Sequence, residues 1–202
     1  MKLIGLSGLI GSGKGTVADI LEKNHNFTKV SFADSVKDSV AVVFGWPRNL
    51  LDGNTPESRD WREVVDHWWA NRLNIPHLTP RWVIQFWGTE LCRHNFHEDI
   101  WIASLERKLL RLNETNPNTK LVISDIRFPN EMKVIKNLGG KTWCIKRGID
   151  PVWFTTYANG GETPKNIHPS EWEWARESFN CTIRNNGTKD ELVSLISSLL
   201  GY

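Results

Sequence analysis

The stretch that decides the fold lies at the start of the chain and reads Leu3-Ile4-Gly5-Leu6-Ser7-Gly8-Leu9-Ile10-Gly11-Ser12-Gly13-Lys14-Gly15-Thr16. Its first four residues are an apolar run of the kind that forms a buried strand. Helical spacing of apolar residues follows it, at Val17, Ile20 and Leu21. The glycine-rich turn between them has the pattern G-x-x-x-x-G-K, and a strand before it and a helix after it are the context that gives this pattern functional meaning.

A glycine loop in this position binds the phosphates of a nucleotide, because its backbone N–H groups converge and the next helix adds its positive dipole end. Lys14 supplies a point charge to the β- and γ-phosphates. The predicted nucleotide-binding residues are Gly11, Ser12, Gly13, Lys14, Gly15 and Thr16. Gly15 stands where the pattern usually has Ser or Thr, so the hydroxyl of Thr16 is assigned to the phosphates and not to a metal.

A second buried strand ends in a carboxylate, in the run Leu121-Val122-Ile123-Ser124-Asp125. Such an acid lies beside the phosphate loop and holds Mg²⁺, here through water. Arg127 is two residues further along, so its side chain can emerge on the same side as Asp125. Glu131 has two interpretations: a ligand-binding residue, or a first-turn helix residue favoured by the helix dipole.

Apolar runs alternate with helical patterns along the chain, which predicts an α/β fold with a five-stranded parallel sheet between helical layers. The strands are expected at residues 3–6, 29–32, 121–124, 142–146 and 182–184. One domain is expected over residues 1–202. Two long segments fit the alternation poorly, and we interpret 46–79 as an insertion near the acceptor site and 148–169 as a lid-like segment.

A further helix is predicted from Thr79, its N-cap, with Pro80 as its first residue. One face of this helix is expected to carry Arg81, Gln85, Gly88 and Thr89. Arginine can bind a phosphate with two parallel hydrogen bonds, and glutamine can read the edge of a base, so this face suits a ligand.

Three other positions stay open between a functional and a structural interpretation. Asp34 is either a ligand-binding residue or a helix N-cap, and Lys37 is either a ligand-binding or a solvated residue. The stretch Asn185-Asn186-Gly187-Thr188 is either a purine-facing loop beside the phosphate loop or a tight turn.

Composition argues against several classes of protein. A chain of 202 residues with 40% hydrophobic and 24% charged residues is an ordinary globular one. The net charge of +2 is too small for a surface that coats nucleic acid, so no nucleic-acid polymer is expected as a partner. Three scattered cysteines indicate neither a zinc site nor disulfides. With no apolar run of about 20 residues, we expect a cytoplasmic protein without membrane contact, and eleven tryptophans are compatible with a homodimer.

Together these stretches resemble the bacteriophage deoxynucleoside monophosphate kinases, a branch of the P-loop kinases. The resemblance covers residues 8–16, 31–37, 79–93, 124–131, 168–171 and 185–188. It implies a nucleoside monophosphate kinase-like fold and the transfer of the γ-phosphoryl group of ATP, with Mg²⁺, to a deoxynucleoside monophosphate. The products, dNDP and ADP, would serve phage DNA synthesis in the host cytoplasm.

The resemblance also distributes roles over the site. Catalytic roles are implied for Lys14, Asp125, Arg127 and Arg81. Acceptor binding is implied for Ala33, Asp34, Lys37, Arg81, Gln85, Thr89, Arg127 and Glu131. ATP binding is further implied for Asn185 and Gly187. Two alternatives are another small-molecule P-loop kinase, such as dephospho-coenzyme A kinase, and a nucleotide-binding switch without catalysis.

Overall fold

The computed structural model describes residues 1–201, and the chain divides into two compact units. Unit 1 comprises Met1–Ser31 and Glu106–Tyr202, and unit 2 comprises Phe32–Leu105. Each unit contains a hydrophobic cluster of its own. That the whole chain acts as one kinase domain stays a prediction.

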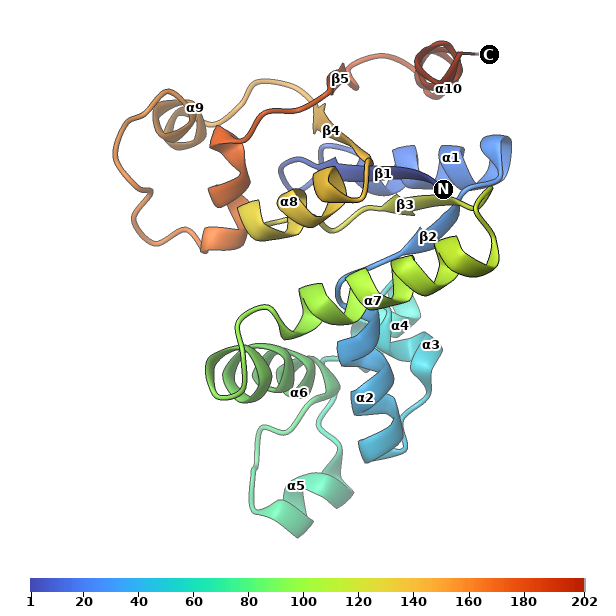
Figure 1. The fold of residues 1–202 in the computed structure, drawn as a ribbon. Coiled ribbons are helices and arrows are strands. Elements are labelled where there is room, and N and C mark those ends of the chain that lie inside the picture. The colour runs from blue at the N-terminus through green and yellow to red at the C-terminus, as the bar shows by residue number, and fades with distance from the viewer. Residues whose placement is uncertain (202) are drawn as a thin grey trace. The chain divides into compact units, whose positions relative to one another are not determined.

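Unit 1 is built on a five-stranded parallel sheet, which confirms the predicted fold class (Figure 1). The strands are β1 (Lys2–Ser7), β2 (Thr28–Val30), β3 (Lys120–Ile123), β4 (Lys141–Lys146) and β5 (Cys181–Arg184). Each predicted strand is present, and their order in the sheet is β2-β3-β1-β4-β5. Because β1 is central, the carboxyl ends of β3 and β4 lie on either side of the glycine loop that follows it.

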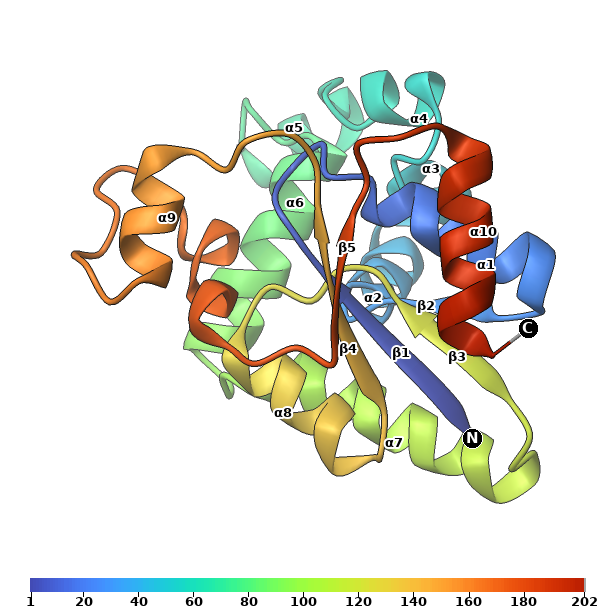
Figure 2. The same ribbon diagram turned by 90° about the horizontal axis from the view of Figure 1, so that it is seen from above.

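Helices cover both faces of this sheet (Figure 2). The helices of unit 1 are α1 (Lys14–His25), α7 (Ile100–Thr115, which begins in unit 2), α8 (Pro129–Asn137), α9 (Val152–Ala158) and α10 (Lys189–Leu200), with the short 3-10 helices η2 (Pro169–Glu171) and η3 (Glu173–Arg176). Ile4 and Leu6 of β1 join the cluster formed with α1 and α10. A Cβ at Gly5 would instead meet Ile126 and Ile135 of the α8 side. Successive residues of a strand face opposite ways, so α1 and α10 form one layer and α8 the other.

Unit 2 is helical. It contains α2 (Asp34–Phe44), α3 (Arg48–Leu51), α4 (Pro56–Trp61), α5 (His67–Leu73), α6 (Pro80–Gln85) and the π-helix η1 (Phe86–His94). Its core is aromatic: the rings of Phe44 and Trp46 stack at 4.5 Å, and Trp61, Trp69 and Trp87 pack around them. Several of the eleven tryptophans are therefore core residues, and the segment 46–79 is an ordered part of this unit.

The helix predicted from Thr79 begins as expected, since the Thr79 hydroxyl accepts a hydrogen bond from the Trp82 N–H at 3.1 Å. From Phe86 it continues as a π-helix, whose turn holds more residues than an α-turn. Gly88 is consequently buried against Val36, so the prediction that it shares the polar face is wrong. The other members of that face, Arg81, Gln85 and Thr89, are exposed.

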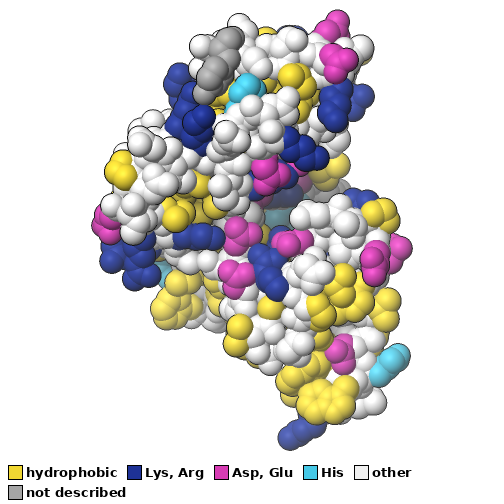
Figure 3. Space-filling model, turned by 90° about the vertical axis from the view of Figure 1, so that its right-hand side faces the viewer, with side chains coloured by type: hydrophobic (Ala, Val, Ile, Leu, Met, Phe, Trp, Pro, Cys, Tyr) yellow, Lys and Arg dark blue, Asp and Glu magenta, His cyan; other side chains and the backbone are white. Residues whose placement is uncertain are grey.

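Charged side chains of both signs are interspersed over the face shown in Figure 3, in keeping with the small net charge. Within residues 1–201, no helix has the length and apolar character needed to cross a membrane.

Candidate active site

The glycine loop connects β1 to α1 through a backbone that favours glycine. Gly11 has φ +80° and Gly13 has φ +97°, both in the left-handed region that other residues rarely adopt. Gly13 is the N-cap of α1, which begins at Lys14. The N–H groups of the first turn of a helix have no partner within the helix, so they can bind an anion.

Asn185 supports this loop from the end of β5. Its side-chain amide donates a hydrogen bond to the Ser12 carbonyl at 3.0 Å, and its own N–H donates to the Lys146 carbonyl at 2.7 Å. A Cβ at Gly13 would lie 2.2 Å from Nδ2 of Asn185. The structure thus brings Asn185 to the phosphate loop, where it fixes the loop backbone; a direct contact with ATP stays a prediction.

We predict that Gly13→Ala weakens nucleotide binding by at least about tenfold, because left-handed strain and the Asn185 clash each cost about 1 kcal/mol or more. Gly139→Ala is the matched control. Gly139 also has a positive φ of +73°, but it follows α8, outside the glycine loop, and no atom lies within 4 Å of an added Cβ. Isothermal titration of both variants with ATP measures the difference, and equal affinities would show that the loop does not depend on the Gly13 conformation.

Lys14 points back over the loop. Its ammonium donates hydrogen bonds to the Gly8 carbonyl at 2.5 Å and the Leu9 carbonyl at 3.0 Å. Burial, and to a smaller extent nearby Arg127, lowers the pKa of Lys14 to about 8, while Glu171 opposes the shift. A phosphate would replace the two carbonyls as acceptor and stabilise the charged form of Lys14.

From this pKa we predict that ATP affinity depends on pH. Below pH 8 the Lys14 amine is already protonated before ATP binds. Above pH 8 the free protein has lost this proton and must take it up again when the phosphates bind. The association constant should therefore fall by up to about tenfold per pH unit above 8, since one proton is taken up on binding. Titrations between pH 7 and 9.5 test this, with Lys14→Met as the control that should show a flat profile; the same slope in both proteins would contradict it.

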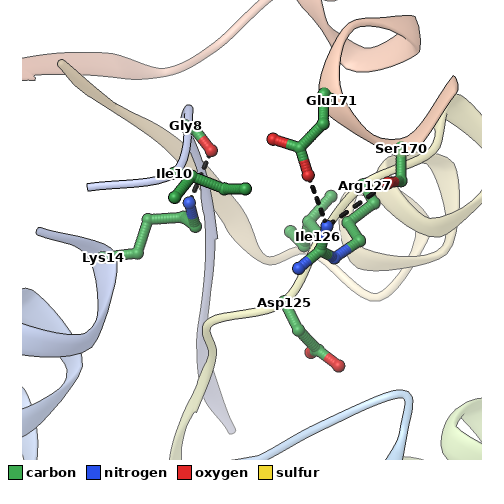
Figure 4. A pocket seen from close by; sticks show the side chains of 8 residues that line it. All are labelled: Gly8, Ile10, Lys14, Asp125, Ile126, Arg127, Ser170 and Glu171. Atoms are coloured by element: carbon green, nitrogen blue, oxygen red, sulfur yellow. Dashed lines mark hydrogen bonds and ion pairs between the residues drawn. The ribbon is translucent and has the colours of Figure 1, made fainter. Parts of the chain in front are cut away.

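Lys14 and Arg127 line one small pocket at the carboxyl edge of the sheet, together with Gly8, Ile10, Asp125, Ile126, Ser170 and Glu171 (Figure 4). Its free volume is about 10 Å³, enough for a single water molecule, so a phosphate requires side chains to move. Two of the predicted catalytic cations and the predicted metal-side acid are thus brought together.

Asp125 accepts a hydrogen bond from the Ser31 hydroxyl at 2.5 Å. Among residues 1–201, no group of three or more His, Cys, Asp or Glu side chains could hold a metal ion. A single carboxylate suits Mg²⁺ that is held mainly by nucleotide phosphates and water, which is the form predicted for Asp125.

The backbone at Arg127 is fixed by Glu131. The Glu131 carboxylate accepts hydrogen bonds from the N–H groups of Arg127 at 2.7 Å and Phe128 at 3.2 Å, and its side chain is 2% exposed. Of the two interpretations, this burial favours the helix-start role over direct substrate contact. The Arg127 guanidinium is half exposed and bonded to Ser170 and Glu171.

The predicted acceptor residues of unit 2 belong to two groups. Asp34 pairs with Arg48 at 3.3 Å and Lys37 with Asp52 at 3.1 Å, and Arg48 joins the pairs by contacting Asp52 at 2.6 Å. Burial raises the pKa of Asp52, but the hydrogen bonds from Arg48 and Lys37 outweigh it and leave that pKa lowered. Half-buried Ala33 is the N-cap of α2.

The second group contains Arg62, which the sequence analysis missed. Its guanidinium lies against Gly53, whose φ of +66° and missing side chain leave room for it, and Nη1 donates to the Leu51 carbonyl at 3.4 Å. Burial and then Arg81 lower the pKa of Arg62. Arg81 itself pairs with Glu63 at 2.9 Å.

The buried Nε of Arg62 has no hydrogen-bond partner among the described residues. A buried donor normally has an acceptor, and an arginine cannot give up its proton to avoid the need. Two neighbouring guanidinium groups with one unpaired donor form a site suited to an anion. In the sequence, Arg62 is marked only by its position in the segment 46–79, which is expected to lie near the acceptor site.

Comparison with known proteins identifies relatives of this chain. No family model matches the chain. A provisionally named deoxynucleotide monophosphate kinase of Acanthamoeba polyphaga mimivirus is 32% identical over 206 residues, covering 98% of this chain and 95% of that protein. The deoxynucleoside-5'-monophosphate kinase of Escherichia phage T5 is 29% identical over 66% of this chain and 71% of its own length, and the deoxynucleotide monophosphate kinase of Enterobacteria phage T4 is 23% identical over 99% of both.

Solved structures that resemble the chain include dephospho-CoA kinase from Campylobacter jejuni, at TM-score 0.47 and 13% identity over 98% of this chain and 95% of that one. Shikimate kinase from Aquifex aeolicus has TM-score 0.42 and 16% identity over 99% of both chains. With 32% identity over almost the whole of both proteins, the chain belongs to the deoxynucleotide monophosphate kinase family.

Proposed function

We propose that the protein transfers the γ-phosphoryl group of ATP to a deoxynucleoside monophosphate, giving ADP and dNDP. The observation that carries the proposal is the pocket where Lys14 of the glycine loop and Arg127 lie together, in a chain of this family. The acceptor phosphate is largely a dianion at pH 7, so no general base is needed. Catalysis then consists of aligning two polyanions and neutralising charge on the transferred group.

A cavity of about 140 Å³ beside the glycine loop supports ATP as the donor. It is lined by Arg184, Asn185, Gly187, Thr188, Glu191, Leu192 and Leu195. The two leucines offer an apolar surface for a purine ring, and Asn185 links the cavity to the loop through Ser12. There is also a structural reason for a glycine at position 187, because a Cβ there would lie 2.1 Å from the Glu191 carboxylate that caps α10.

When bound with ATP, Mg²⁺ would neutralise part of the negative charge of the phosphates. Asp125 would hold it through water, while Lys14 and the N–H groups at the start of α1 bind the phosphates directly.

For the acceptor, we assign the phosphate to Arg62 and Arg81 and the base to Gln85 and Thr89 of the same helical segment. The unpaired Nε of Arg62 supports the first assignment, and the exposure of Gln85 and Thr89 supports the second. We place the reaction in the host cytoplasm, since the relatives come from viruses and phages. A homodimer and the absence of a nucleic-acid partner stay predictions.

We predict ADP release that depends on at least one deoxynucleoside monophosphate. A coupled assay should compare the four common dNMPs, 5-substituted dCMP, the matching ribonucleotides and dephospho-coenzyme A, each against a control without acceptor. Turnover with dephospho-coenzyme A alone would favour the other kinase class, and ATP binding without turnover on any acceptor would favour a nucleotide-binding switch.

We further predict that Arg62→Ala raises the KM for the dNMP by about 10- to 100-fold, because a hydrogen bond to a charged group contributes about 1.5–3 kcal/mol. The KM for ATP should stay the same. Arg72→Ala, which removes an exposed arginine of α5, is the matched control and should behave as wild type. An unchanged dNMP KM in Arg62→Ala would remove Arg62 from the acceptor site.

A further inference from the structure

Two acids, Asp125 and Glu171, line the pocket that contains Lys14 and Arg127. Asp125 is predicted to hold Mg²⁺ through water, whereas the proposed phosphate chemistry gives Glu171 no role. A negative side chain beside bound phosphates would repel them, so its place calls for a physical reason.

The contacts of Arg127 give that reason. Nη1 of Arg127 donates to Oε1 of Glu171 at 2.9 Å and to the hydroxyl of Ser170 at 3.3 Å. This nitrogen carries two hydrogens, so both are used. Within residues 1–201, Nε and Nη2 of Arg127 have no hydrogen-bond partner. These two nitrogens form an edge that can donate two parallel hydrogen bonds to one phosphate.

Glu171 is itself held in place. It ends η2, and the next residue, Trp172, is 8% exposed. The Trp172 ring packs edge-on against Tyr157 with 4.7 Å between the centroids, and its indole N–H donates to the Ile167 carbonyl at 2.9 Å. Arg176 adds hydrogen bonds to the carbonyls of Tyr157 at 2.9 Å and Gly161 at 2.7 Å. The carboxylate is therefore presented by a packed aromatic segment and not by a free loop end.

Exposed ion pairs usually contribute little, because two long side chains must be ordered in water. Here one partner is already ordered: the Glu171 side chain is only 20% exposed, while that of Arg127 is 47% exposed. The backbone of Arg127 is fixed by Glu131. Glu171 therefore determines the direction of the one part of Arg127 that is still free to rotate.

We propose that Glu171 is a positioning residue that holds one terminal nitrogen of Arg127, so that the Nε and Nη2 edge is directed at the transferred phosphoryl group. The proposal rests on the proposed function and assigns Glu171 no contact with substrate. The charge of Glu171 also offsets the repulsion between Arg127 and Lys14, since it opposes the lowering of the Lys14 pKa.

A double-mutant cycle tests this. Arg127→Ala should lower kcat by about 10³-fold and Glu171→Ala by about 10²-fold, with the KM for ATP unchanged, because a misdirected group costs rate more than binding. Glu171→Gln should recover most of the activity, since its amide oxygen can still accept from Nη1. In the Arg127→Ala background, Glu171→Ala should change kcat by less than about twofold. Glu177→Gln, which neutralises the acid paired with Lys136 at 3.2 Å, is the control and should match wild type.

A second readout does not depend on turnover. In ¹⁵N spectra, the two terminal nitrogens of Arg127 should give separate signals while Glu171 hinders rotation of the guanidinium, and Glu171→Ala should merge them. Circular dichroism confirms that each variant is folded. If wild type phosphorylates no acceptor, the proposed function fails and these spectra alone decide the positioning role.

Three results would overturn the positioning role in an active enzyme. The first is full or increased activity of Glu171→Ala. The second is a loss in the double mutant that multiplies the two single losses, which would show that Glu171 acts independently of Arg127. The third is an identical Arg127 spectrum with and without the carboxylate.

Discussion

The binding of phosphate by the backbone requires several N–H groups that point to one place. The interior of a helix or strand cannot provide them, because its N–H groups already donate to backbone carbonyls. Here the loop between β1 and α1 provides them, and Gly11 and Gly13 in this loop have the left-handed backbone conformation. Once the loop lies at the carboxyl end of the central strand, the order β2-β3-β1-β4-β5 brings the ends of β3 and β4 to its sides. Asp125 and Arg127, more than a hundred residues later, reach the loop for this reason alone.

Most of the cations predicted to bind phosphate are bonded to acceptors of the protein within their own unit. Lys14 uses two loop carbonyls, Lys37 uses Asp52 and Arg81 uses Glu63. These acceptors satisfy the donors of the cations in the protein without ligand, and their replacement by phosphate oxygens stays a prediction. Arg62 differs because its buried Nε has no such acceptor among the described residues, which is the physical reason to expect an anion there.

The elements predicted from sequence are those with a local signal. The strands are apolar runs, and Thr79 and Pro80 mark a helix start by their own chemistry. Arg62 has no such signal, because nothing in the sequence distinguishes it from exposed arginines such as Arg72. The space for its guanidinium is left by Gly53, nine positions earlier. Glu171 meets Arg127 across 44 positions, and only the folded segment between them creates that contact.

Periodicity also fails where a helix changes its own period. The sequence predicts one α-helical face through residue 89, but the π-turns that begin at Phe86 bury Gly88 against Val36. The Gly88 carbonyl accepts a hydrogen bond from the buried indole of Trp101 at 2.8 Å. A residue with any side chain would crowd Val36 at 3.3 Å, so the glycine permits both contacts. The wider turn is therefore stabilised by neighbours outside the helix, and of the predicted polar face only Arg81, Gln85 and Thr89 are exposed.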